Sequence, residues 1–162
     1  MIGAKDLKRR QRVSEIFAEG CLETADDFVN AAMVFQHGSV PDHFFQTYLW
    51  ASRAAELDDK NRHAKALMAL GLDRYLRNKG YKQLYASQAH RDDTPGSSGC
   101  WCLWPVEESA TDEFRALSGM DTLAQKIKWI SELNKGNPTC REPKCTENAN
   151  AVPKGSLPGV AW

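Results

Sequence analysis

The chain has 162 residues, of which 42% are apolar and 26% charged, and its 21 basic side chains balance its 21 acidic ones. These values are typical of one ordinary soluble domain. Zero formal charge argues against nucleic acid as a partner, because affinity for a phosphate backbone depends on clustered Lys and Arg. No window reaches the roughly 18 consecutive apolar residues of a membrane-spanning helix, and the start MIGAKDLKRRQRV is too charged for a secretory signal. We therefore expect a cytoplasmic protein with reduced thiols and no membrane or nucleic-acid partner.

The first twenty residues predict an N-terminal helix. Four apolar residues are spaced as one helical stripe, namely Leu7, Val13, Ile16 and Phe17. The basic run Lys8–Arg12 has two interpretations, a patch for nucleic acid or lipid and a solvated helix face. The balanced total charge favours the solvated face.

Three further helices are predicted over 25–37, 41–57 and 61–79. Thr24 can accept a backbone N–H as the first N-cap, and Gly38 suits the position just past the helix end. Polar turns separate the three apolar stripes, so we expect consecutive antiparallel helices.

The second half of the chain is less regular. Residues 87–99 are polar and rich in Gly, Pro and Ser, which predicts a loop. The apolar run Cys100–Trp104 indicates a buried extended segment, with a strand pair left open. Thr111 and Asp112 begin a short helix, and the stripe over 123–133 predicts a longer amphipathic one.

The domain organisation follows from these elements. We predict a single helical domain over 1–136 and an irregular tail over 137–162, which holds four of the seven prolines. The loop 89–99 and the chain after Pro138 should be the most mobile parts, because their apolar content is too low to offset the entropy of ordering.

The segment AAELDDKNRHAKALMALGLDRYL resembles the junction between tetratricopeptide-type repeats, where an Ala-rich helix ends in a Leu-Asp turn and an Ala/Leu/Gly/Tyr helix follows. The resemblance covers roughly Thr24 to Gly80, and Ala31–Phe35 and Gly71–Tyr75 are related by a shift of forty residues. It implies an all-α fold of tetratricopeptide-like helical hairpins, to which the chain adds an irregular Cys-containing loop and a C-terminal tail.

A second resemblance is to an uncharacterised bacterial family with Phe-Gln-His-Gly and Asp-Arg-Tyr-Leu helix ends and a downstream Gln-x-(Tyr/Phe)-Gly-Thr-Gln element. This chain has AAMVFQHG at 31–38, DRYL at 73–76 and QLYASQ at 83–88. The similarity covers most of residues 25–134, with Ala86-Ser87 where the family has Gly-Thr. The resemblance implies a fold and a set of polar positions, without a reaction.

Those polar positions predict one site. His37 lies twelve residues after Ala25, and Asp73 lies twelve after Asn61, so the first and third helices, which run parallel, should bring both to one end of the bundle. The candidate catalytic residues are His37, Asp73, Arg74 and Tyr85, and the candidate binding residues are Gln36, Gln83 and Gln88.

The chemistry of this site has two interpretations. In an acid–base site, the carboxylate would raise the basicity of the imidazole, Arg74 would hold an anionic group and Tyr85 would donate a proton. In a structural network, His37 caps its helix while Asp73 and Arg74 form a salt bridge. The second interpretation is the commoner one in small helical domains.

The cysteines indicate no cofactor. Cys100-x-Cys102 and Cys140-x4-Cys145 match the spacing of structural zinc sites poorly. A Cys140–Cys145 disulfide is geometrically possible, but a cytosolic protein would keep it reduced. Cys21 is expected to be buried packing. Because phosphate-binding loops, Gly-x-Ser-x-Gly elbows and His-Glu-x-x-His helices are missing from the sequence, we predict neither metal nor cofactor.

The sequence thus predicts a small helical protein that binds a peptide or protein partner in an accessory or immunity-type role. The alternative is a small acid–base enzyme that uses the His–Asp pair with Arg74 and Tyr85 on a small polar or peptide substrate. The oligomeric state does not follow from the sequence.

Overall fold

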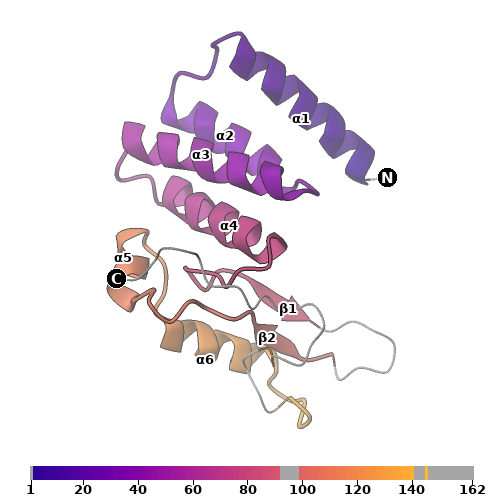
Figure 1. Cartoon of the computed structure of the whole chain (residues 1–162), viewed down its shortest axis with the longest axis vertical. Helices are drawn as coiled ribbons and strands as arrows, with labels where there is room; N and C mark the ends of the chain where they lie inside the picture. Colours follow the sequence, from indigo (N-terminus) through magenta and orange to yellow (C-terminus); the bar gives the residue numbers. More distant parts are fainter. Residues whose placement is uncertain (1, 92–98, 141–144, 146–162) are drawn as a thin grey trace. The chain divides into compact units, whose positions relative to one another are not determined.

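The computed structural model of the chain, shown in Figure 1, describes residues 2–91, 99–140 and 145. The chain divides into two compact units, Met1–Tyr75 and Leu76–Trp162, and the boundary lies within helix α4 (Arg62–Asn78). The described part is mostly helical and includes one two-stranded sheet. The proposed division into a domain over 1–136 and a tail over 137–162 stays a prediction.

The first unit contains α1 (Ile2–Ala18), α2 (Ala25–Gln36), α3 (Pro41–Leu57) and most of α4. These helices confirm the four predicted in this half of the chain. Local chemistry explains their starts: the Thr24 hydroxyl accepts the N–H of Asp27 at 3.2 Å, and the Asp27 carboxylate accepts the N–H of Thr24 at 2.9 Å. Pro41 occupies the first turn of α3, where its missing N–H costs nothing.

Helices α2, α3 and α4 follow one another along the chain, and each runs antiparallel to the one before it. The Thr47 hydroxyl, in the middle of α3, donates to the Ala32 carbonyl of α2 at 3.3 Å. The Phe45 ring, near the start of α3, lies 5.0 Å from the Tyr75 ring near the end of α4. The core between the helices is made of apolar side chains whose burial drives the packing, among them Phe28, Phe35, Trp50, Ala51, Ala54, Ala64 and Leu67.

Gly71 sets the closest approach of α4 to α3. A Cβ built at this position would lie 2.9 Å from the carbonyl oxygen of Phe44 and 2.9 Å from the amide nitrogen of Tyr48. Both atoms belong to the backbone of α3, so they cannot rotate away. The crossing therefore requires glycine.

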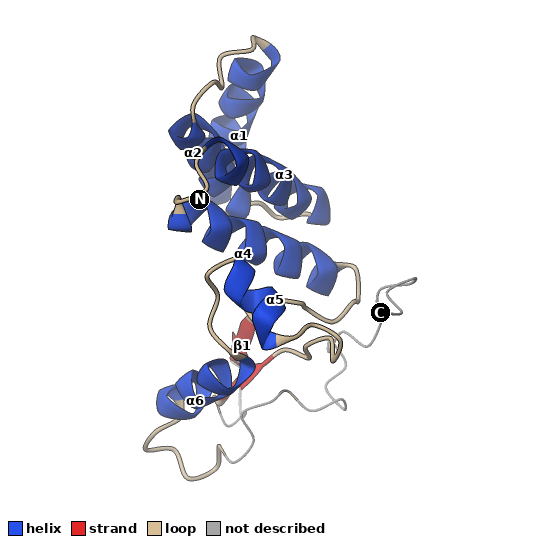
Figure 2. Ribbon diagram, turned by 90° about the vertical axis from the view of Figure 1, so that its left-hand side faces the viewer, coloured by secondary structure: helices blue, strands red, loops and turns tan. Residues whose placement is uncertain are grey.

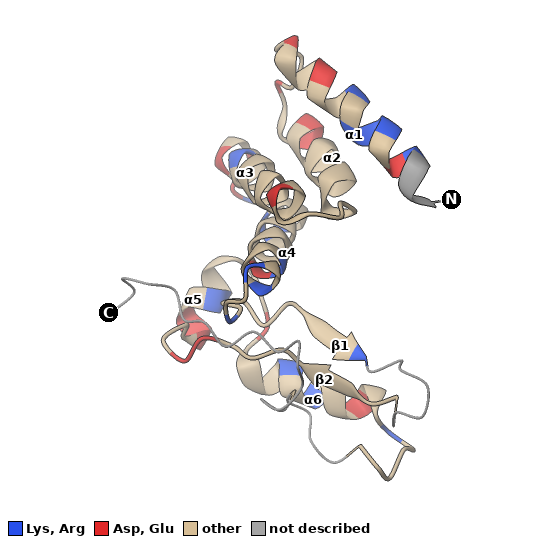
Figure 3. Ribbon diagram, turned by 45° about the vertical axis from the view of Figure 1, so that its right-hand side comes forward, with Lys and Arg blue, Asp and Glu red and all other residues tan. Residues whose placement is uncertain are grey.

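The basic run of α1 is largely an exposed helix face, as the sequence predicted, and Figure 3 shows its Lys and Arg residues in blue along the helix. Arg9 pairs with Asp6 at 3.1 Å and Arg12 pairs with Glu15 at 3.0 Å, and the side chains of both arginines are exposed. Arg10 is the exception within the run, because only 8% of it is exposed.

The second unit is built around strands β1 (Ala89–Arg91) and β2 (Trp101–Leu103), with helices α5 (Asp112–Leu117) and α6 (Leu123–Leu133) (Figure 2). The strands pair antiparallel with Ala89 opposite Leu103. The all-α prediction therefore misses a short sheet, and β1 lies inside the stretch predicted to be a loop. Leu103 and Ile130 are the largest apolar side chains of a small core.

Two disulfides tie β2 to the chain beyond α6. Cys100 is bonded to Cys140, and Cys102 is bonded to Cys145. The expectation of reduced thiols is therefore wrong for these four residues, and the two bonds are long-range rather than the local Cys140–Cys145 pairing that was geometrically possible. A disulfide sulfur offers no thiolate to zinc.

Two other predictions concern Cys21, which lies in the first unit, and the mobility of two segments of the second unit. Cys21 is exposed rather than buried. The two segments predicted to be mobile are 89–99 and the chain after Pro138. Most of both lies outside the described residues, which leave out 92–98, 141–144 and 146–162.

Candidate functional site

The C-terminal end of α2 carries two of the predicted site residues and is bonded to two arginines. His37 is the C-cap of the helix and is exposed, and its carbonyl accepts from Nη1 of Arg10 at 3.4 Å. The preceding carbonyl, of Gln36, accepts from Nη1 of Arg74 at 2.6 Å. Carbonyls at a helix end lack intrahelical partners and carry partial negative charge, so two guanidinium groups stabilise this end.

Two buried polar atoms at this end have no hydrogen-bond partner among the described residues. They are Nε of Arg10 and Oε1 of Gln36, on side chains that are 8% and 5% exposed. Buried polar atoms of this kind are normally satisfied by ordered water or by a polar group of a ligand. Gln36 therefore remains a sound candidate for a binding residue.

His43, which the sequence did not single out, belongs to the same cluster. Its Nδ1 accepts the N–H of Ser39 at 3.2 Å, and its ring stands edge-on to that of Phe35 at 5.7 Å. Burial, and then the positive charge of Arg10, lower the pKa of His43 below its ordinary value of 6.5. The neutral imidazole is therefore the form that the fold favours.

We predict that the first unit loses stability as the pH falls through the His43 titration. Because the folded pKa is depressed, the unfolded chain binds more protons between the two pKa values. The contribution of His43 is fully present above about pH 6.5 and is lost as the pH falls toward the folded pKa. Urea titrations from neutral to mildly acidic pH should show a decline that His43→Gln removes. The matched control, His63→Gln at an exposed position of α4, should keep it; an equal decline in both variants would contradict the assignment.

Asp73 and Arg74 differ in their surroundings. Asp73 is fully buried within α4, with 0% of its surface exposed. Arg74 is half-buried, and its guanidinium lies 5.3 Å from the centre of the Phe44 ring. The approach of His37 to Asp73 stays a prediction.

The remaining site residues lie in the second unit, where Gln83 is a structural brace. Its Nε2 donates to the carbonyls of Trp104 at 2.8 Å and Gln88 at 3.1 Å, and its Oε1 accepts the N–H of Gln88 at 2.8 Å. Gln83 is 1% exposed, so the three hydrogen bonds of its side-chain amide are made in the interior of the second unit. Gln88 is also buried. The bonds of Gln83 favour a structural over a ligand-binding role.

Replacing Gln83 by Ala should therefore destabilise the second unit by about 2 kcal/mol, since it strands buried backbone groups of Gln88 and Trp104. The loss is measured by chemical denaturation, in which hydrogen exchange reports the unfolding of the second unit. The control is Gln11→Ala, because Gln11 is exposed on α1. Gln125 is unsuitable as a control because its side chain caps α6. Equal stability of the Gln83 and Gln11 variants would contradict the structural role of Gln83.

Tyr85 and Ala86 form the turn that Gln83 braces. Tyr85 is 5% exposed and its ring stacks on that of Phe114 at 4.8 Å. Ala86 has a φ of 56°, the left-handed region that favours glycine. This is the position at which the chain has Ala where the resembled family has Gly, so the backbone adopts the glycine-type geometry without glycine.

The seven predicted residues thus fall into both units. Gln36, His37, Asp73 and Arg74 belong to the first, and Gln83, Tyr85 and Gln88 belong to the second. Hydrogen bonds join Arg74 to Gln36, and Gln83 to Gln88. The assembly of all seven into one site stays a prediction. Sequence reasoning missed Arg10 and His43, because neither lies in a motif.

Comparison with protein-family models, with curated proteins and with solved structures finds no match to this chain. The two resemblances therefore remain hypotheses. Among the described residues, no group of three or more His, Cys, Asp and Glu side chains could hold a metal ion.

Proposed function

We propose that the chain binds a peptide or protein partner through an aromatic face on α3 and α4. This aromatic face consists of Phe45, Tyr48, Leu49 and Tyr75. Phe45 is 39% exposed and Leu49 is 44% exposed. The Phe45 ring lies 5.9 Å from that of Tyr48 and 5.0 Å from that of Tyr75. This cluster of three contacting rings, in which Phe45 and the neighbouring Leu49 are exposed and the two tyrosines are half-buried, is the observation that carries the proposal.

The aromatic face suits binding for two physical reasons. Burying one such side chain contributes about 1.5–3 kcal/mol, and rings that already pack on one another lose little conformational entropy when a partner covers them. Aromatic anchors of this kind are enriched among the residues that dominate binding energy. The tetratricopeptide-like arrangement that we infer for α2, α3 and α4 would present this face on a rigid scaffold.

The chemistry of the remaining surface limits the partner class. The charge balance of the sequence gives no support to nucleic acid. Within the described part of the chain, no helix is both long and apolar enough to cross a bilayer. The two disulfides favour an oxidising compartment over the cytoplasmic location expected from the sequence. An accessory or immunity-type role is compatible with these features.

The double variant Phe45→Ser/Leu49→Ser tests the proposal by affinity purification from the native host, quantified by mass spectrometry. A partner held by the aromatic face should be depleted about tenfold or more, because two anchors are lost. The control is Leu57→Ser, which removes a similarly exposed leucine, 42% exposed, from the end of the same helix. Equal recovery from both variants would contradict the proposal.

The acid–base enzyme remains the second hypothesis, and the buried carboxylate of Asp73 is the feature that favours it. If the chain is such an enzyme, His37→Ala should abolish turnover and leave stability nearly unchanged. If His37 instead contacts Asp73 as a structural pair, the same variant should lower stability, because it would leave the buried carboxylate of Asp73 without that partner.

A further inference from the structure

A cavity of about 390 Å³ lies in the second unit, beside the Cys100–Cys140 disulfide. Arg91, Gly99 and Trp101 line it from the side of the sheet. The other wall is the turn that follows α6, with Asn137 and Cys140 among its residues. The cavity is therefore bounded by two segments that are far apart in the sequence.

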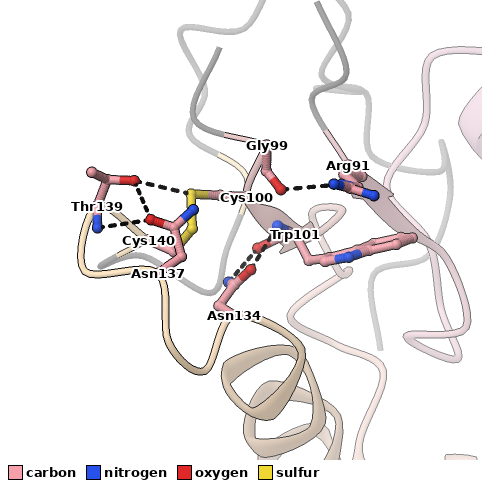
Figure 4. Close-up of a disulfide and its surroundings, with 8 residues drawn as sticks. All are labelled: Arg91, Gly99, Cys100, Trp101, Asn134, Asn137, Thr139 and Cys140. Atoms are coloured by element: carbon pink, nitrogen blue, oxygen red, sulfur yellow. Dashed lines mark hydrogen bonds between the residues drawn. A yellow bond between two sulfur atoms is a disulfide. The ribbon is translucent and has the colours of Figure 1, made fainter.

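Two different attachments join these walls (Figure 4). At one end, the Asn134 side chain accepts the N–H of Trp101 and donates to its carbonyl, both at 2.8 Å. At the other end, the attachment is the covalent bond between Cys100 and Cys140. Asn134 is only 8% exposed, so its two hydrogen bonds are protected from water. The turn is thus fixed at a buried hinge and at a disulfide latch.

The two disulfides differ in their surroundings. Cys140 lines the cavity, and the Sγ of Cys100 makes an exposed contact with the Thr139 hydroxyl at 3.9 Å. The backbone of Cys145, in contrast, donates to the carbonyl of Leu103 at 2.9 Å, next to a core side chain that is 2% exposed. All four cysteines are half-buried, but among the described residues that line the cavity there is Cys140 and neither Cys102 nor Cys145, so a thiol entering the cavity would reach the first bond.

The charge of the cavity also favours attack on the Cys100–Cys140 bond. Arg91 and Lys135 line it, and the described lining residues include no acidic one. The carboxylate of Glu132, which is not among those lining residues, lies 3.7 Å from Nζ of Lys135, so two cationic groups face the cavity with one neighbouring carboxylate. Positive charge attracts an anionic thiolate and stabilises the thiolate that leaves, which speeds thiol–disulfide exchange.

We propose that Cys100–Cys140 is a redox latch, which thiol reductants open while Cys102–Cys145 stays closed. A thiolate attacks Sγ of Cys140, the S–S bond breaks, and Cys100 leaves as a thiolate that takes up a proton. A second thiolate then attacks the mixed disulfide and releases Cys140, also as a thiolate that is protonated. Two electrons pass from the reductant, which is oxidised to its disulfide, to the cysteine pair. The turn after α6 then pivots about Asn134 and opens the cavity.

The rates of reduction test the latch. The folded protein is treated with glutathione, which is anionic, and free thiols are alkylated at intervals and assigned by peptide mass spectrometry. Cys100 and Cys140 should become free about tenfold faster than Cys102 and Cys145. In denaturant, where the cavity is lost, the two bonds should react at similar rates. Equal rates in the folded protein, or earlier opening of Cys102–Cys145, would overturn the proposal.

Electrostatic control is tested by Lys135→Gln, which replaces an exposed side chain and leaves the hinge intact. It should slow cleavage of Cys100–Cys140 by glutathione about threefold at low salt and should not slow cleavage by cysteamine, a cationic thiol. Identical responses to both thiols would contradict the role of cavity charge.

Opening of the turn is tested in Cys100→Ser/Cys140→Ser by amide hydrogen exchange. The amides of Lys135, Gly136, Asn137 and Thr139 should exchange about tenfold faster than in the parent, while Trp101 and Leu103 keep their protection. Unchanged exchange at 135–139 would show that the disulfide does not restrain the turn and would overturn the latch.

Discussion

Replacing Cys100, Cys102, Cys140 and Cys145 together by serine should destabilise the second unit by about 4 kcal/mol or more. The two bonds close loops with sequence separations of 40 and 43 residues. Closing one loop of that length is worth about 4 kcal/mol in the chain-entropy model. Once one bond exists, the second closes a much shorter loop and adds less. The core of this unit is small, so a loss of this size should leave it largely unfolded.

Hydrogen exchange resolved by peptide measures this effect separately in the two units. Protection over α6 and β2 should fall by several orders of magnitude, while α2 and α3 keep theirs. Cys21→Ser is the matched control, because Cys21 is exposed and forms no disulfide. A second unit that remains fully protected without its four cysteines would show that its core suffices for folding.

Gly71→Val should destabilise the first unit by about 2 kcal/mol. The added Cβ would meet backbone atoms of Phe44 and Tyr48 at 2.9 Å, so α4 must move away from α3 and the packing around Thr47 must loosen. Overpacking of this kind costs about 1–3 kcal/mol, and valine recovers only part of the roughly 1 kcal/mol by which glycine disfavours a helix. The steric clash therefore outweighs the gain in helix propensity, and the variant is less stable than the parent.

Thermal and urea denaturation of Gly71→Val measure the loss. Ala66→Val is the matched control, since it places the same side chain in the same helix at a half-buried position. It should cost less than about 1 kcal/mol, which is the range of helix propensity. Equal losses in the two variants would show that the crossing has room for a side chain.

The helices of the first unit could be predicted because their signals are local. Thr24 with Asp27 marks the start of α2 and Pro41 the start of α3, and Gly38 directly follows the C-cap His37 of α2. The apolar spacing between these marks has a period that only a helix matches. Packing between the helices is compatible with the boundaries that these local signals specify.

The sheet and the disulfides could not be predicted because they depend on distant partners. Ala89–Arg91 has no alternating apolar pattern and becomes a strand only by pairing with Trp101–Leu103. The pairing of four cysteines has three possible arrangements that sequence does not distinguish. The expectation of reduced thiols followed from the inferred compartment, not from the cysteines themselves.

The candidate site was predicted in part for the same reason. His37 and Gln36 lie at the end of α2 as expected, since a helix boundary is a local property. The contact of Arg10 with that end joins residues 27 positions apart, and nothing in the basic run of α1 distinguishes this one buried arginine. The internal bonds of Gln83 likewise depend on the course of the chain at Trp104.

Site-specific photocrosslinking in the native host is the most direct measurement of partner binding by the aromatic face. A photoreactive phenylalanine analogue replaces Phe45 in one variant and Leu57 in another, and both side chains are exposed in the free chain. We expect one discrete protein adduct at position 45 that is weak or missing at position 57 and is lost when Leu49→Ser is added. The same adducts at both positions, or none at position 45, would contradict the claim that the aromatic face of α3 and α4 binds a partner.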